Sequence, residues 1–83
     1  MTEEEYLTRA GDLKDRLYRT AYLYLYSEAW AVDAVDEAVY KGLCSCRRLR
    51  QPEFFDTWLT RILINVCKGD LRRRRREVLV DRL

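Results

Sequence analysis

Residues that interrupt helices are scarce in this chain. Its 83 residues include a single proline, Pro52, and three glycines at positions 11, 42 and 69. So few breakers favour long helices joined by few turns over a multi-stranded sheet. Strict alternation of apolar and polar residues, the pattern of a half-buried strand, is missing over any useful length. The sequence therefore predicts an all-α fold, a compact three-helix domain with a basic loop between the second and third helices.

Caps and apolar stripes define the first two helices. Thr2 is a suitable N-cap for a first helix that opens with three glutamates, whose charges suit the positive end of the helix dipole. Ser27 is a suitable N-cap for a second helix that ends near Cys46 or Arg47. Residues at helical spacing predict the core face of the first helix, namely Ala10, Leu13, Leu17, Ala21 and Leu25. Small residues predict a face of close approach on the second, namely Ala31, Ala34 or Val35, Ala38, Gly42 and Cys46.

Four tyrosines crowd the end of the first helix, Tyr18, Tyr22, Tyr24 and Tyr26. Their rings could stack on bases, but we expect them to pack at a seam between helices. On another face of the second helix, acidic residues and a tyrosine share one helical spacing, namely Asp33, Asp36, Glu37, Tyr40 and Lys41. This acidic patch is interpreted as a protein-binding surface, with an ordinary solvated face as the alternative.

A loop at residues 48–53 precedes an amphipathic third helix. Pro52 suits the first turn of that helix, and one of Phe54 and Phe55 should be held in the core. An apolar stripe predicts the buried face, namely Trp58, Leu59, Ile62 and Val66. A polar stripe lies about a quarter turn away from it, namely Thr57, Arg61, Asn65, Lys68 and Arg72.

Positive charge gathers in the second half of the chain. Residues 1–40 hold nine acids and four bases, whereas residues 41–83 hold five acids and twelve bases. Five consecutive arginines, Arg72 to Arg76, close the third helix, and adjacent like charges favour a polyanionic partner. From Thr57 to Arg72 the helix should span about 22 Å, about six nucleotides. A line of donors ending in dense positive charge is typical of a nucleic-acid-binding helical domain.

Composition also bears on chemistry and compartment. The chain has three cysteines, Cys44, Cys46 and Cys67, an odd number that does not form a complete set of disulfides. Its N-terminus is acidic, unlike that of a signal peptide. Both observations favour a reducing, cytoplasmic location. Without any histidine, this spacing is not a usual zinc ligand set, so we expect buried or half-buried thiols, no metal and no cofactor. No nucleophile–base constellation is evident, which argues against an enzyme. No stretch approaches the ~20 apolar residues of a membrane span.

Three segments together resemble a known family. They are Leu-Tyr-Arg-Thr-Ala-Tyr at 17–22, Asp-Ala-Val-Asp-Glu-Ala-Val-Tyr-Lys at 33–41, and Phe-Asp-Thr-Trp-Leu-Thr-Arg-Ile-Leu-Ile-Asn at 55–65, followed by Leu71 and the arginines. In this order and spacing they resemble region 2 of bacterial sigma factors, most closely the extracytoplasmic-function class (group IV of the sigma-70 family). The resemblance covers residues 6–76.

The resemblance implies a non-enzymatic specificity subunit, with the chemistry left to the polymerase. It places the docking surface for the clamp helices of the largest subunit of core RNA polymerase on the acidic patch. It implies that the loop captures a flipped base of the melted promoter −10 element and that the third helix holds the non-template strand. The DNA-binding positions it implies are Arg48, Arg50, Gln51, Thr57, Trp58, Arg61, Asn65, Lys68, Arg72, Arg73 and Arg75.

The resemblance also frames the domain organisation and the alternatives. Residues 1–76 would form the region 2-like domain, and residues 77–83 a tail or the start of a linker. The family normally carries a second domain, region 4, after this one, so we expect either an excised domain or a natural short form. Two other interpretations remain open: a general duplex-DNA-binding helical domain, and a protein-interaction module bound by an anti-sigma factor.

Overall fold

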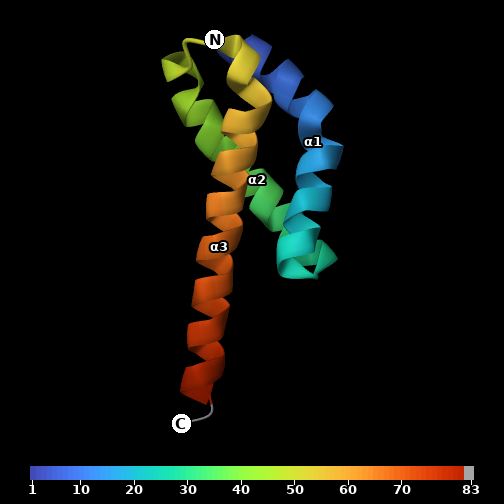
Figure 1. Ribbon diagram of the computed structural model, residues 1–83, viewed down its shortest axis with the longest axis vertical. Coiled ribbons are helices and arrows are strands. Elements are labelled where there is room, and N and C mark those ends of the chain that lie inside the picture. The colour runs from blue at the N-terminus through green and yellow to red at the C-terminus, as the bar shows by residue number, and fades with distance from the viewer. Residues whose placement is uncertain (82–83) are drawn as a thin grey trace.

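Three α-helices pack against one another in pairs around a single core (Figure 1). The computed structural model describes the backbone of residues 1–81 and the side chains of residues 1–77. The helices are α1 (Glu3–Leu25), α2 (Glu28–Ser45) and α3 (Phe55–Asp81), with two short 3₁₀ turns, η1 (Cys46–Arg48) and η2 (Pro52–Phe54), between α2 and α3. The predicted all-α, three-helix fold is therefore confirmed. None of the described helices is both long enough and apolar enough to cross a membrane.

Both predicted N-caps form. The hydroxyl of Thr2 accepts a hydrogen bond from the backbone N–H of Glu5 at 3.1 Å, and the hydroxyl of Ser27 accepts one from the N–H of Trp30 at 3.2 Å. Between α1 and α2, Tyr26 adopts a left-handed backbone conformation with φ 52°. Its N–H donates to the carbonyl of Tyr22 at 2.8 Å, which closes α1. Because so few residues separate the two helices, α2 turns back directly against α1.

The predicted apolar faces of α1 and α2 are buried as expected. The sequence interpretation missed Tyr6, whose side chain has no exposed surface. Its hydroxyl donates to the carbonyl oxygen of Val39 at 2.6 Å, and its ring meets those of Phe55 and Trp58 edge-on, with centroids 5.8 and 6.2 Å away. Gly42 makes room for this ring, since a Cβ there would overlap the hydroxyl and lie 2.9 Å from Cζ of Tyr6. Tyr6 therefore joins all three helices.

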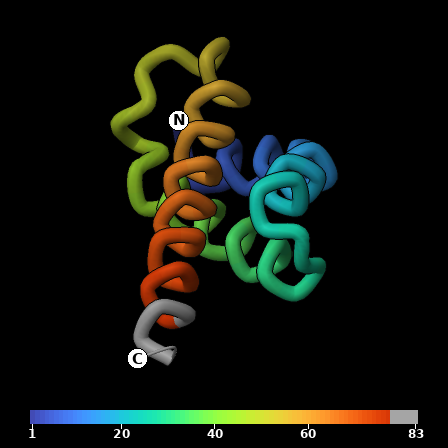
Figure 2. Tube along the Cα trace, turned by 60° about the horizontal axis from the view of Figure 1, so that its bottom comes forward, coloured from blue at the N-terminus to red at the C-terminus, as the bar shows by residue number. Residues whose placement is uncertain are grey.

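α3 is one continuous helix (Figures 1 and 2), and in Figure 1 it extends well beyond the ends of α1 and α2. Phe55 is fully buried and Phe54 is 53% exposed, which confirms that one of the pair is held in the core. The sequence left the residues after Arg76 as either the end of the third helix or the start of a connector, and the helix continues to Asp81. Residues 82–83, the rest of the expected tail, lie outside the described residues.

Three side chains differ from the sequence interpretation. Tyr22 is 40% exposed and Tyr26 is 77% exposed, so the expected packing of all four tyrosines at a seam is wrong for these two. They form a surface ladder instead, in which the ring of Tyr22 lies 6.5 Å from that of Tyr18 and 6.3 Å from that of Tyr26. Cys44 is exposed because it lies on the outer face of α2, whereas Cys46 and Cys67 are buried as expected.

Candidate nucleic-acid interface

The loop before α3 and the first two turns of α3 enclose a hollow of about 560 Å³. Basic, polar and apolar side chains line it together. Its lining is Ser45, Arg48, Leu49, Arg50, Gln51, Phe54, Thr57, Trp58 and Arg61. Six of the predicted DNA-binding residues are therefore brought together, and we call this site the loop pocket. Leu49 and Phe54 belong to the base-capturing loop that the resemblance implies, although neither was among the named DNA-binding residues.

Contacts on both sides hold the loop in place. Arg9 of α1 donates from Nη1 to the carbonyl oxygen of Pro52 at 2.8 Å, and its guanidinium lies 4.6 Å from the ring centroid of Phe55. On the other side, Arg47 pairs with Glu3 at 3.5 Å. Each exposed contact contributes little alone, but together with the buried Phe55 they fix both ends of the loop. The loop pocket is thus formed in the unbound chain.

Trp58 serves two surfaces. Its ring packs on Phe55 with centroids 5.9 Å apart and meets Tyr6 edge-on, which confirms the core role expected from the apolar stripe. The same side chain is only half-buried and lines the loop pocket. An aromatic ring that packs against the core on one side and lines a pocket on the other is a suitable platform for a stacked base.

The polar stripe of α3 continues away from the loop pocket. Arg61, Asn65 and Lys68 are exposed along it, and a second hollow of about 390 Å³ runs beside them. Arg16 of α1 also lines that hollow and pairs with Asp56 at 3.5 Å. Arg16 was missed because 40 residues separate it from its partner, and no local pattern reveals such a pairing.

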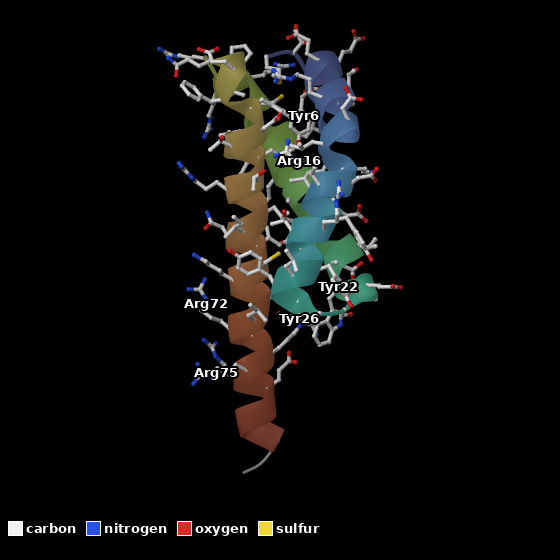
Figure 3. The ribbon with its side chains drawn as sticks, turned by 45° about the vertical axis from the view of Figure 1, so that its right-hand side comes forward. Tyr6, Arg16, Tyr22, Tyr26, Arg72 and Arg75 are labelled. Carbon is white, nitrogen blue, oxygen red and sulfur yellow. The ribbon has the colours of Figure 1, made fainter. Side chains whose placement is uncertain are left out.

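The arginine run lies at the far end of the stripe. The side chains of Arg72 and Arg75 lie on the side of α3 that faces away from α1 (Figure 3). Arg73 is exposed and pairs with the nearly buried carboxylate of Asp70, one turn earlier. A third hollow, of about 510 Å³, lies between the run and α2 and is lined by Glu37, Lys41, Asn65, Val66, Gly69, Arg72, Arg73 and Arg76. The predicted DNA-binding and polymerase-binding residues therefore adjoin each other at this hollow.

The acidic patch of α2 forms one outward surface. Asp33, Asp36, Tyr40 and Lys41 are exposed and Glu37 is half-buried, with Tyr40 66% exposed. Within the patch, Glu37 and Lys41 pair at 3.6 Å. A surface pair of this kind exchanges easily for contacts with a partner. The structure brings all five residues together, while their binding partner remains a prediction.

The chemistry of these surfaces is that of binding. Guanidinium and amide donors lie along α3 beside an aromatic pocket, an arrangement that suits phosphates and bases. Burial, with the Asp70 carboxylate adding to it, raises the pKa of the Cys67 thiol, so this group is poorly suited to act as a thiolate. Within the described part of the chain, no group of three or more His, Cys, Asp or Glu side chains could hold a metal ion.

Comparison with known proteins identifies the family. Residues 11–77 match the family described as Sigma-70 region 2. The chain is 31% identical over 75 residues to "RNA polymerase sigma factor SigV" of Bacillus subtilis (strain 168), an alignment that covers 90% of this chain and 45% of that protein. The chain thus spans less than half the length of this relative, and no solved structure gives a significant match. The recognition of region 2 of an extracytoplasmic-function sigma factor is confirmed, and the chain belongs to the sigma-70 region 2 family.

Proposed function

We propose that this domain docks on core RNA polymerase and recognises and melts the promoter −10 element during transcription initiation. It acts as a non-enzymatic specificity module, and its second partner is the non-template strand of the melted element. The observation that carries the proposal is the loop pocket, where six expected DNA-binding residues meet at the start of a basic helix.

Melting requires that the protein recover the energy spent on opening the duplex. Extruding a base costs a few kcal/mol in lost stacking and pairing, and a fitted pocket with phosphate contacts can supply it. In this domain, the half-buried Trp58 and the exposed Phe54 offer aromatic surface for the base, and Gln51 offers hydrogen bonds to its edge. Arg61 and the outward arginines would then contact the phosphates of the bound strand along α3.

Docking on polymerase is proposed for the acidic patch. Its carboxylates and the exposed ring of Tyr40 lie on α2, beside the hollow that also contains Arg72 and Arg73. A polymerase bound to α2 would therefore hold the nucleic acid against α3 from the neighbouring side. This arrangement supports the combination of both partners in one small domain.

The first test measures binding to a single-stranded oligonucleotide library of −10 length and to matched duplexes, at two salt concentrations. We expect a sequence-selective, salt-sensitive preference for single strands. Gln51→Ala and Phe54→Ala should relax selectivity at one position of the strand. Leu23→Ala, which truncates an exposed apolar side chain outside the three hollows, is the matched control. Equal or better duplex binding would favour general duplex recognition, and no binding to either would favour a protein-interaction module.

The second test addresses polymerase. Asp33→Lys with Glu37→Lys reverses charge on the acidic patch, where Asp33 is exposed and the Glu37 side chain is 42% exposed. We expect the variant to lose association with core RNA polymerase in a pull-down while its circular dichroism spectrum stays that of the parent. Unchanged association of a folded variant would remove the docking assignment.

A further inference from the structure

One arginine of the run behaves unlike its neighbours. Arg72, Arg73, Arg75 and Arg76 are exposed, whereas Arg74 is half-buried. Its guanidinium carbon lies 3.1 Å from the centroid of the Trp30 ring, and its Nε atom is buried without a hydrogen-bond partner. A guanidinium over an indole face is held by its charge and its planar shape together. Arg74 is therefore engaged within the fold.

Helical spacing explains why this arginine turns inward. Arg74 follows the buried Leu63 and Cys67 by eleven and seven residues, about three and two turns, and so lies on their face of α3. Arg72 and Arg75 are offset from this face and point outward (Figure 3). The run thus has an inward member and outward members on one continuous helix.

The surface under Arg74 is well fixed. Trp30 lies in the first turn of α2, where its N–H is bound by the Ser27 cap, and the next residue, Ala31, is fully buried. The indole is 38% exposed, so it borders the surface while its backbone is anchored. Contact with Trp30 ties the projecting half of α3 to the corner between α1 and α2.

We infer that Arg74 is a positioning residue: by stacking on Trp30 it holds the projecting half of α3 and sets the direction in which Arg72 and Arg75 present their charges. In this role Arg74 makes no phosphate contact of its own. The nucleic-acid part of the inference rests on the proposed function, whereas the contact between α3 and α2 can be tested without any ligand.

Two adjacent arginines provide the matched pair for the test. In Arg75→Lys a point charge remains for phosphate while the planar fork is lost, so affinity for single-stranded oligonucleotide should fall, by no more than about twofold. In Arg74→Lys the planar stack is lost, and affinity should fall about two- to fivefold. Removal of charge separates the roles further: Arg75→Gln should reduce the salt slope by about 0.7, and Arg74→Gln, which loses no phosphate contact of its own, should reduce it by less. An equal loss of slope in both Gln variants would overturn the inference.

Hydrogen exchange gives the readout that needs no nucleic acid. Arg74→Lys should speed exchange of the backbone amides of residues 71–77, and Arg75→Lys should not. Trp30→Leu should reproduce the effect, and adding Arg74→Lys to it should change nothing further. Unaltered exchange in both Arg74→Lys and Trp30→Leu would refute the positioning role. If no variant, parent included, bound oligonucleotide while exchange responded as expected, the proposed function would fail and the contact would stand.

Discussion

Substituting Gly42 by alanine tests how tightly α1 and α2 are packed. The new Cβ would overlap the hydroxyl of Tyr6 and lie 2.9 Å from its Cζ atom. Tyr6 has little room to move, because its hydroxyl is bonded to the carbonyl of Val39 and its ring is enclosed by Phe55 and Trp58. The substitution must therefore displace a fully buried aromatic side chain.

The expected magnitude follows from three contributions. Overpacking a well-filled core costs about 1–3 kcal/mol. Loss of the Tyr6 hydrogen bond to Val39 adds about 1 kcal/mol. Alanine in a helix interior returns about 1 kcal/mol relative to glycine. We therefore expect Gly42→Ala to lower the free energy of unfolding by about 1–3 kcal/mol.

Urea denaturation followed by circular dichroism at 222 nm measures the effect. Gly11→Ala is the matched control, because it is also inside a helix but a Cβ there meets nothing within 4 Å, so it should raise stability by about 1 kcal/mol. On a Tyr6→Phe background the overlap with the hydroxyl is gone, and Gly42→Ala should cost about 1 kcal/mol less than in the parent. The reasoning fails if Gly42→Ala stabilises the domain as Gly11→Ala does.

Three further outcomes follow from the same structure. Burial, with smaller contributions from Cys46 and Cys44, raises the pKa of Tyr6 from 10.0 to about 12. The unfolded chain therefore loses this proton first, and the free energy of unfolding should fall as the pH rises from 10 to 12. Alkaline unfolding of Tyr6→Phe should lack that contribution. Iodoacetamide should modify the exposed Cys44 well before the buried Cys67, as mass spectrometry of timed samples would show, and equal rates would contradict the packing. Tyr26→Val should lower stability by about 1 kcal/mol, because a β-branched residue tolerates positive φ poorly, and a thermal melt that does not shift would count against this turn geometry.

Local patterns were sufficient for the helices and much of the core. Thr2 and Ser27 were recognisable as caps because their hydroxyls act on N–H groups three residues away. The buried stripes of α1 and α2 follow from helical spacing alone. Tyr6 escaped because it follows three glutamates and resembles a solvated first turn. Only packing against α2 and α3, from distant parts of the chain, buries it.

For the candidate site, the sequence identified the residue types, and the structure showed in which direction each side chain points. The loop and the stripe of α3 were predicted, and they do meet in the loop pocket. Five identical arginines in a row, however, carry no information on which one turns inward. That choice depends on Trp30, 44 residues earlier, just as the position of Arg16 depends on Asp56. Contacts of this separation are set by how the helices cross, which no short window of sequence specifies.

The unbroken course of α3 from Phe55 to Asp81 has a consequence for how the chain can change in length. A residue inserted between Thr57 and Arg72 would turn everything beyond it by about 100° and advance it by about 1.5 Å. The outward arginines would then leave the line of the loop pocket, and Arg74 would leave Trp30. An extra residue in the connection at residues 49–51 would not rotate one part of α3 against another. Relatives that keep this arrangement should therefore keep a constant count of residues along α3.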